Sequence, residues 1–139
     1  MVDKKQAKLI QVSGKRKKSV ARATIRKGTG IVKINKEPLA IYSTELARLR
    51  VKEPILLAES QAKTVDISVN VYGGGWSSQT EAIRLSIAKA LVEYTKSAEL
   101  KKKFLDYDRH LLVADTRYKE TKKPGTHSHA RSKRQLSFR

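Results

Sequence analysis

Three consecutive glycines, Gly73 to Gly75, could form a phosphate-binding site, because backbone amides in a glycine-rich turn can bind phosphate. The triplet lies between a segment that predicts a strand and one that predicts a helix. It lacks the lysine of a P-loop and the spaced glycines of a dinucleotide fingerprint, so we expect no nucleotide cofactor. The turn either packs the helix tightly on the sheet or contacts a phosphate of RNA.

The three histidines do not form a catalytic or metal-binding pattern. His110 lies close to Asp108, and a histidine at a helix end accounts for this pair better than an acid–base site does. His127 and His129 lie in a basic tail, where no nearby carboxylate would orient an imidazole toward a metal. The chain has no cysteine, which excludes thiolate ligands, disulfides and cysteine nucleophiles. We expect no enzyme, no metal, no cofactor and no small-molecule substrate.

Positive charge is the dominant chemical feature of the chain. Its 139 residues contain 31 Lys and Arg against 13 Asp and Glu, which gives a formal net charge of +18. Residues 1–33 carry 11 basic side chains and 1 acidic one, residues 34–115 carry 12 and 11, and residues 116–139 carry 8 and 1. This excess favours an anionic partner, and nucleic acid is the first candidate. A membrane surface is not expected, because neither basic end predicts an amphipathic helix.

The two basic ends differ in kind. The run at 15–18 leads into an alternating segment that places Arg22 and Arg26 on one side of a strand, where they can contact successive phosphates. The tail mixes basic and small polar residues with one aromatic, Phe138, which can stack on a base. It has too few apolar side chains to offset its ordering entropy, so we expect it to be extended when alone. Residues 120–139 could then reach about 65 Å at roughly 3.3 Å per residue.

The basic residues and the glycine turn need strands to position them. Alternation of apolar and polar side chains predicts three strands. Two lie at 19–26 and 31–35, and the glycine turn at 28–30 is expected to join them as a hairpin. A third lies at 64–72 and has one apolar and one polar face. The segment 111–114 is expected to be buried as an edge strand.

Helical spacing predicts the remaining elements. Pro38 opens a helical stretch that Pro54 divides into two short helices. Its apolar stripe consists of Leu39, Tyr42, Leu46, Leu49, Ile55, Leu56 and Leu57. A core helix covers about 79–96, capped by Ser77 or Ser78, and another covers about 98–107. The stripe of the core helix consists of Ile83, Ile87, Leu91 and Tyr94.

These elements predict one domain over residues 1–119 and a separate basic tail over 120–139. No apolar run approaches the roughly 20 residues of a membrane-spanning helix. The basic start is not followed by an apolar region, which does not fit a secretory signal. We therefore expect a cytoplasmic protein without a membrane partner.

The glycine triplet also carries a family resemblance. The sequence GGGWSSQ at 73–79, followed by small and apolar residues at helical spacing, resembles the signature of the universal ninth small-subunit ribosomal protein family. The start of the chain at 14–30 is similar to the N-terminal half of that family, and residues 122–139 are similar to its tail. The segment 107–119 is more similar to the archaeal and eukaryotic members than to the bacterial ones.

The resemblance implies both a fold and a function. The fold is α+β: a two-layer domain with helices on one face of a small, mostly antiparallel sheet, a left-handed crossover and an extended basic tail. The protein would be a structural component of the small-subunit head that binds ribosomal RNA and other head proteins. Its tail would reach the anticodon stem of the peptidyl-site tRNA, with Arg139 as the phosphate contact. Residues 126–129 depart from the glycine and arginine usual in such tails, which lowers the expected charge density and leaves a pH-sensitive role of the histidines open.

The residues expected to bind RNA follow from the basic clusters, the glycine turn and the resemblance. For ribosomal RNA they are Lys15, Arg16, Lys17, Lys18, Arg22, Arg26, Gly74, Gly75, Gln79, Lys122, Lys123 and Arg131. For tRNA they are Lys133, Arg134, Phe138 and Arg139.

Two alternatives belong to other classes of protein. A basic packaging protein outside the ribosome would explain the charge but would not need the glycine–glutamine signature. An enzyme with a basic cleft would need convergent titratable groups in residues 34–115, and none converge by sequence.

Overall fold

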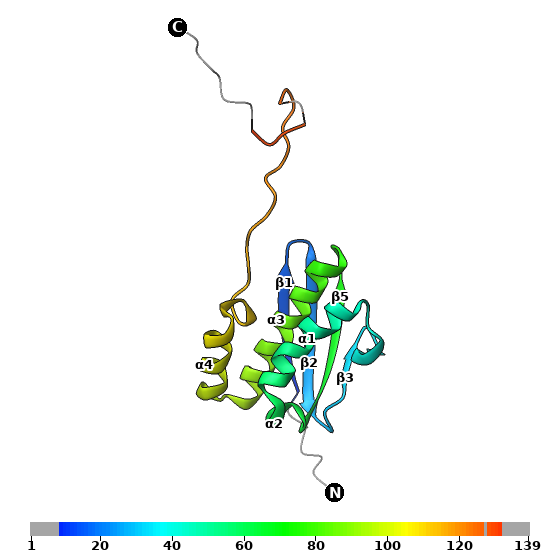
Figure 1. Cartoon of the computed structure of the whole chain (residues 1–139), viewed down its shortest axis with the longest axis vertical. Helices are drawn as coiled ribbons and strands as arrows, with labels where there is room; N and C mark the ends of the chain where they lie inside the picture. The colour runs from blue at the N-terminus through cyan, green and yellow to red at the C-terminus, as the bar shows by residue number, and fades with distance from the viewer. Residues whose placement is uncertain (1–8, 127, 132–139) are drawn as a thin grey trace, which may run out of the picture.

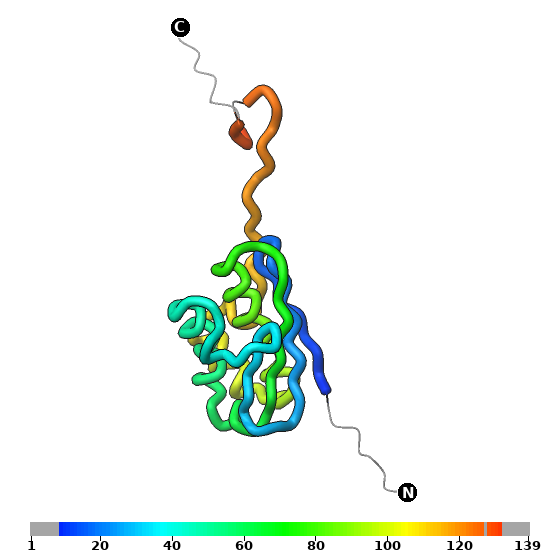
Figure 2. Tube along the Cα trace, turned by 90° about the vertical axis from the view of Figure 1, so that its right-hand side faces the viewer, coloured from blue at the N-terminus to red at the C-terminus, as the bar shows by residue number. Residues whose placement is uncertain are grey.

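Five strands form one sheet in the computed structural model, which describes residues 9–126 and 128–131. The strands are β1 (Ile10–Arg16), β2 (Ser19–Lys27), β3 (Val32–Ile34), β4 (Glu37–Pro38) and β5 (Val65–Tyr72), in the spatial order β1-β2-β5-β3-β4. The helices are α1 (Glu45–Leu57), α2 (Glu59–Ala62), α3 (Trp76–Thr95) and α4 (Ala98–Tyr107). They lie on one face of the sheet, as the two views in Figures 1 and 2 show. The predicted α+β architecture with two layers is confirmed.

Among the three longest strands, β2 is antiparallel to both of its neighbours, β1 and β5. Arg16 of β1 lies opposite Ser19 of β2, so Lys17 and Lys18 form the tight turn between these strands. Ala23 of β2 lies in turn opposite Val69 of β5. The inward residues of β2 and β5 are buried and the outward ones are mostly exposed, which confirms the alternation predicted for both segments.

The expected hairpin between β2 and β3 is wrong, because β5 lies between these two strands. The glycine turn at 28–30 binds β5 instead of closing a hairpin. The backbone amide of Gly28 donates to the carbonyl oxygen of Thr64, and the amide of Gly30 donates to that of Val65. β3 then pairs with β5 in parallel.

The connection from β3 to β5 crosses the helical face through α1 and α2. In Figure 1, where the helices face the viewer, the chain passes in front of the sheet from β3 to β5 on its left. This is the left-handed crossover that the family resemblance implies, and it contrasts with the right-handed form that almost all parallel connections take.

The segment after Pro38 differs from the predicted pair of helices. Pro38 lies in β4 and precedes a 3-10 turn, η1 (Leu39–Ile41), and α1 begins only after Thr44, whose hydroxyl accepts a hydrogen bond from the Ala47 amide. Pro54 lies inside α1 and does not end it. The predicted stripe is also wrong in part, since its residues Leu46, Leu49 and Leu56 are exposed. The residues of α1 that face the core are Ala47, Val51 and Pro54.

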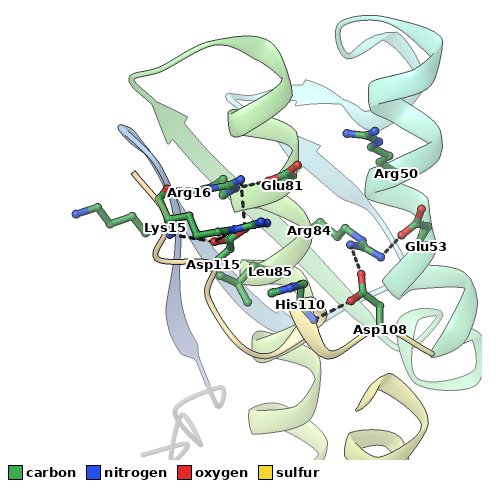
Figure 3. A pocket seen from close by; sticks show the side chains of 11 residues that line it. Lys15, Arg16, Arg50, Glu53, Glu81, Arg84, Leu85, Asp108, His110 and Asp115 are labelled. Atoms are coloured by element: carbon green, nitrogen blue, oxygen red, sulfur yellow. Dashed lines mark hydrogen bonds and ion pairs between the residues drawn. The ribbon is translucent and has the colours of Figure 1, made fainter. Parts of the chain in front are cut away.

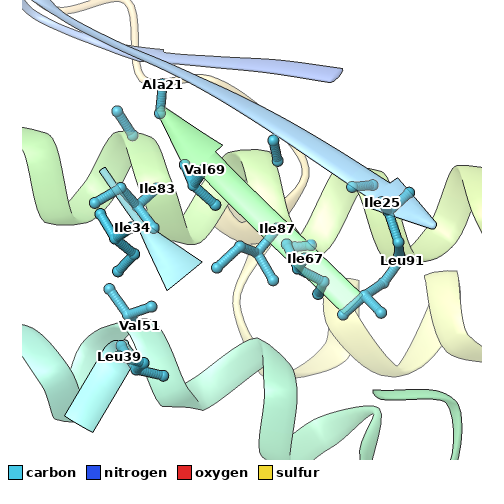
Figure 4. Packing of buried hydrophobic residues seen from close by; sticks show 14 of the residues in the cluster. Ala21, Ile25, Ile34, Leu39, Val51, Ile67, Val69, Ile83, Ile87 and Leu91 are labelled. Carbon is cyan, nitrogen blue, oxygen red and sulfur yellow. The ribbon is translucent and has the colours of Figure 1, made fainter. Parts of the chain in front are cut away.

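The core lies between the sheet and α3. Ile83, Ile87 and Leu91 of α3 are fully buried, as the helical stripe predicts, and they meet the inward side chains of β2, β5 and β3 (Figure 4). β1 approaches α3 at Gly14, where an added Cβ would contact the carbonyl oxygen of Ala82 and lie 2.8 Å from the amide nitrogen of Ser86. Glycine is therefore required here by close packing rather than by backbone conformation.

The end of the domain is less regular than the sequence predicts. α4 matches the predicted span 98–107, but the segment 111–114 is not a strand. Leu111 is buried at the end of a second 3-10 turn, η2 (Arg109–Leu111), and the described residues beyond it form no helix or strand. The chain then runs away from the domain past the turn between β1 and β2 (Figures 1 and 2).

Candidate nucleic-acid interface

The open face of the sheet, opposite the helices, carries a group of basic side chains. Arg22 and Arg26 project from β2 on the side away from the core, as the alternation predicts, and both are exposed. Lys15 of β1 lies opposite Val20 of β2, and Lys33 of β3 lies opposite Ser68 of β5, so both lysines belong to the same face. We call Lys15, Arg22, Arg26 and Lys33 the sheet-face cluster.

Two neighbours orient the arginines of this face. The guanidinium of Arg22 lies 5.6 Å from the centroid of the Tyr72 ring, a cation–π distance. The guanidinium of Arg26 lies 3.8 Å from the Asp66 carboxylate but keeps 65% of its side chain exposed. The backbone amides of Thr29 and Ile31 donate to Asp66 and hold the pKa of its carboxyl below the ordinary value. Because the Asp66 carboxylate already accepts hydrogen bonds from these amides, it offsets only part of the charge of Arg26.

A second basic surface lies at the end of the sheet where the β1–β2 turn meets the glycine triplet. Lys17 and Lys18 are exposed there. The hydroxyl of the buried Ser19 donates to the carbonyl oxygen of Gly73 at 2.8 Å and lies 2.8 Å from the hydroxyl of Ser78 in α3. These contacts hold the lysine turn beside the N-terminus of α3.

Glycine is required at the middle of this turn. Gly74 has φ +65°, and a Cβ there would clash with the hydroxyl oxygen of Ser19. Gly75 precedes α3, has open space around it and has no need of a positive φ. The Gln79 side chain donates to the carbonyl oxygen of Gly73 at 3.1 Å, so this residue, which the sequence predicts as an RNA contact, also supports the turn.

Arg16 differs from the other basic residues of its run because its charge is paired inside the protein. Its Nε lies 2.6 Å from Glu81 of α3 and its Nη2 lies 3.2 Å from Asp115, and only 14% of its side chain is exposed (Figure 3). The sequence predicts all four residues at 15–18 as contacts to ribosomal RNA. The structure separates them, since Lys15, Lys17 and Lys18 are exposed.

The same contacts fasten the base of the tail to the domain. The Arg117 guanidinium and backbone amide, with Arg16 adding its charge, hold the pKa of the Asp115 carboxyl well below its ordinary value. Arg16 also donates to the carbonyl oxygen of Arg117 at 3.2 Å, and the Tyr118 hydroxyl donates to that of Lys17 at 2.8 Å. Sequence analysis missed this anchor, because its partners lie about a hundred residues apart.

A cavity of about 320 Å³ on the helical side contains further paired charges but no catalytic arrangement (Figure 3). Arg84 of α3 lies 2.5 Å from Glu53 of α1 and 2.8 Å from Asp108. Burial opposes ionisation of Asp108, but the His110 amide and the Arg84 guanidinium hold its pKa below the ordinary value. Asp108 thus accepts a hydrogen bond from the backbone amide of His110 and caps the η2 turn. This agrees with the expectation that Asp108 and His110 lie together at a helix end rather than in an acid–base site.

The described part of the tail closes a small loop around Glu120. This carboxylate lies 2.9 Å from the Arg131 guanidinium and 3.5 Å from the Lys123 ammonium. The backbone amide of Lys123 donates to the carbonyl oxygen of His129 at 3.2 Å. Lys122 is exposed. The predicted tRNA contacts Lys133, Arg134, Phe138 and Arg139, as well as His127, lie outside the described residues.

Residues 9–126 and 128–131 contain neither a metal-binding cluster nor a membrane-spanning helix. No group of three histidine or acidic side chains there could hold a metal ion. No helix in this part of the chain combines the length and the apolar character needed to cross a membrane. With its exposed cations on an open sheet face and at one end of that sheet, the molecule falls in the class of basic α+β nucleic-acid-binding proteins.

Comparison with known proteins places the chain within this class. A sequence model of the family described as ribosomal protein S9/S16 matches residues 14–139. Three archaeal relatives, each named small ribosomal subunit protein uS9, are similar over most of their length. The protein of Desulfurococcus amylolyticus is 51% identical over 95% of this chain and 94% of its own. The protein of Pyrobaculum aerophilum is 48% identical over 91% of this chain and 88% of its own. The protein of Methanococcus maripaludis is 43% identical over 95% of this chain and 99% of its own.

The chain belongs to the ribosomal protein S9/S16 family. It is therefore a structural protein of the ribosome and not an enzyme. The resemblance carried by the glycine–glutamine signature is confirmed, and the alternative of a packaging protein outside the ribosome is removed.

Proposed function

We propose that the protein is a component of the small-subunit head that binds ribosomal RNA in the cytoplasm, beside other head proteins, through two connected surfaces. One is the sheet-face cluster and the other is the lysine turn with the glycine triplet. The observation that carries the proposal is the balance of charge: the five strands carry six basic side chains and two carboxylates, and Lys15, Arg22, Arg26 and Lys33 are exposed, whereas the four α-helices carry eight basic side chains and seven carboxylates. The names of the relatives, all small-subunit proteins, support the assembly.

The two surfaces suit phosphate contacts of different kinds. Arg22 and Arg26 are four residues apart on β2, or about 13 Å at roughly 3.3 Å per residue, so they contact different phosphates of one RNA strand. Lys17 and Lys18 offer point charges beside the exposed glycine turn, where the backbone of Gly74 and Gly75 can approach a phosphate closely.

The tail extends the same function beyond the domain. Lys122, Lys123 and Arg131 continue the contacts to ribosomal RNA. Lys133, Arg134, Phe138 and Arg139 contact the peptidyl-site tRNA. The anchor formed by Arg16, Asp115 and Tyr118 supports this proposal, because it sets where the tail leaves the domain.

Salt dependence of RNA binding tests the proposal for the domain. If about 8 phosphates are contacted, log affinity for single-stranded RNA should fall with log salt at a slope of about 6, at about 0.7 per contact. Arg22→Gln and Arg26→Gln should each lower that slope by about 0.7. Lys52→Gln and Lys101→Gln, on exposed positions of α1 and α4, are the matched controls and should leave it unchanged.

Two results of this titration would contradict the proposal. A slope near zero for the unmodified chain would mean that the charge does not bind phosphate. Equal slopes for the sheet-face variants and the helical-side controls would mean that RNA does not use the open face of the sheet.

A further inference from the structure

A hollow of about 550 Å³ lies where the lysine turn, the start of α3 and the base of the tail meet. The side chains that give it chemical character are Lys17, Lys18, Trp76, Tyr118 and Lys119. The hollow is within the size range of small-ligand sites in proteins. The hydroxyl of Tyr118 fastens the tail, whereas no contact described above involves the indole of Trp76.

The two rings are held in place yet remain accessible. Trp76 is the first residue of α3 and is 49% exposed, although its backbone is fixed by the helix. Tyr118 is 56% exposed, and its hydroxyl is tied to the carbonyl oxygen of Lys17 at 2.8 Å. Neither ring belongs to the hydrophobic core. Their faces are therefore available to a planar ligand.

The charges around the rings select an anionic ligand. Lys17, Lys18 and Lys119 are exposed beside them, and the ammonium of Lys15 lies 5.9 Å from the centroid of the Tyr118 ring. Glu81 is the carboxylate that lines the hollow, and its charge is offset by the Arg16 guanidinium at 2.6 Å. An unpaired nucleotide of RNA has both features, because it has a planar base and a phosphate on either side.

We propose that the hollow binds a single unstacked nucleotide of RNA, whose base lies against Trp76 and Tyr118 and whose flanking phosphates contact Lys17, Lys18 and Lys119. The proposal rests on the RNA-binding function proposed above and adds a preference for a bulged or looped nucleotide. Unstacked bases in bulges and loops are the part of RNA that aromatic side chains recognise. The sheet-face cluster, which has guanidinium groups in register, would bind the backbone beside that nucleotide.

The fluorescence of Trp76 tests this site directly, because Trp76 is the single tryptophan of the chain. The probes are two synthetic RNA hairpins that are identical except for one unpaired adenosine in the stem of the first. The full chain is titrated with each, with RNA binding followed by anisotropy of a dye on the RNA. We expect the hairpin with the bulge to quench Trp76 and to bind more tightly than the uninterrupted hairpin.

Substitutions then separate stacking from charge. Trp76→Leu should weaken binding of the bulged hairpin by about 5- to 150-fold, the range for loss of one base–aromatic stack, and leave the uninterrupted hairpin unaffected. Tyr118→Phe, which keeps the ring and loses the hydroxyl, should bind the bulged hairpin better than Tyr118→Leu does. Tyr107→Leu removes a similarly exposed ring from α4 and is the control.

The outcomes distinguish the two proposals. If both hairpins bind equally, without selective quenching, RNA binding stands and the nucleotide site is overturned. Equal losses for Trp76→Leu and Tyr107→Leu would overturn it as well. If neither hairpin binds at any salt concentration, the RNA-binding function itself is overturned.

Discussion

At the scale of single residues, Gly14 marks the place where the sheet and the main helix come closest. The backbone of β1 lies against that of α3 there, with Ala82 and Ser86 on the helical side. Because backbone atoms rather than flexible side chains occupy the space, the helix cannot yield locally. The fit of β1 against α3 depends on the absence of one methyl group.

We predict that Gly14→Ala lowers the free energy of unfolding by about 1–3 kcal/mol, the usual cost of overpacking. Urea denaturation of the full chain measures it. Gly75→Ala is the control, since a Cβ there meets nothing within 4 Å, and its effect should be small. A smaller loss for Gly14→Ala than for Gly75→Ala would show that α3 can move away from β1.

The pKa of Asp115 leads to a prediction about pH. Its carboxyl has a lowered pKa in the folded protein, so between that value and about 3.9 the unfolded chain binds more protons. The stability that Asp115 contributes is therefore complete above about pH 5 and is lost as the pH falls further. Asp66 and Asp108 act in the same direction.

The free energy of unfolding should thus decrease between pH 5 and pH 2, and Asp115→Asn should decrease less than the unmodified chain. Asp106→Asn, at an exposed position of α4, should behave like the unmodified chain. Identical pH profiles for Asp115→Asn and the unmodified chain would show that the anchor does not depend on the charge of Asp115.

At the scale of elements, α1 and α3 use their apolar residues differently. Every stripe residue of α3 up to Leu91 is buried, whereas α1 buries small or medium side chains and exposes leucines such as Leu49, at 55%. α1 packs mainly against α3, and the side chains that it buries there are Ala47, Val51 and Pro54.

Ile87→Ala in α3 should therefore cost about 2–5 kcal/mol of unfolding free energy, because it leaves a cavity in the core. Leu49→Ala in α1 should change it by no more than about 0.5 kcal/mol. Thermal and urea denaturation of the two variants compare them directly. A cost above 2 kcal/mol for Leu49→Ala would mean that the leucine face of α1 packs against another part of the chain.

The periodicity of apolar residues predicted those elements that have one continuous apolar face. β5 and α3 have one wholly apolar face each, so their limits and buried residues were predictable to within a few residues. Strand pairing was not, because Asp66 and the glycine turn, rather than local alternation, decide where β3 lies. The pairing of Arg16 with Glu81 was equally out of reach, since the two residues are 65 positions apart and no pattern links them.

At the scale of the whole molecule, the core of the domain does not extend into the described part of the tail. The domain is held by its core and by the contacts of α3, none of which involve the described residues after Tyr118. The predicted tRNA contact at the C-terminus can therefore be removed without loss of a described core residue.

We predict that small subunits carrying the chain without residues 137–139 assemble normally but lose about 1–3 kcal/mol of affinity for peptidyl-site tRNA, the range for a charged hydrogen bond. Filter binding of tRNA to reconstituted subunits measures the loss. Lys63→Gln, an exposed change next to α2, is the control for charge. Unchanged tRNA affinity would refute the role of the tail end, and failure to assemble would show that these residues anchor the domain.

The excess of positive charge is unevenly distributed between the two layers of the domain. The five strands together carry six basic side chains and two carboxylates, whereas the four α-helices carry eight basic side chains and seven carboxylates. In the field of a polyanion such a molecule rotates before it makes contact, and its sheet side arrives first. Productive encounters during assembly then become more frequent than random collision would allow, and this gain in association rate disappears as salt shortens the range of the field.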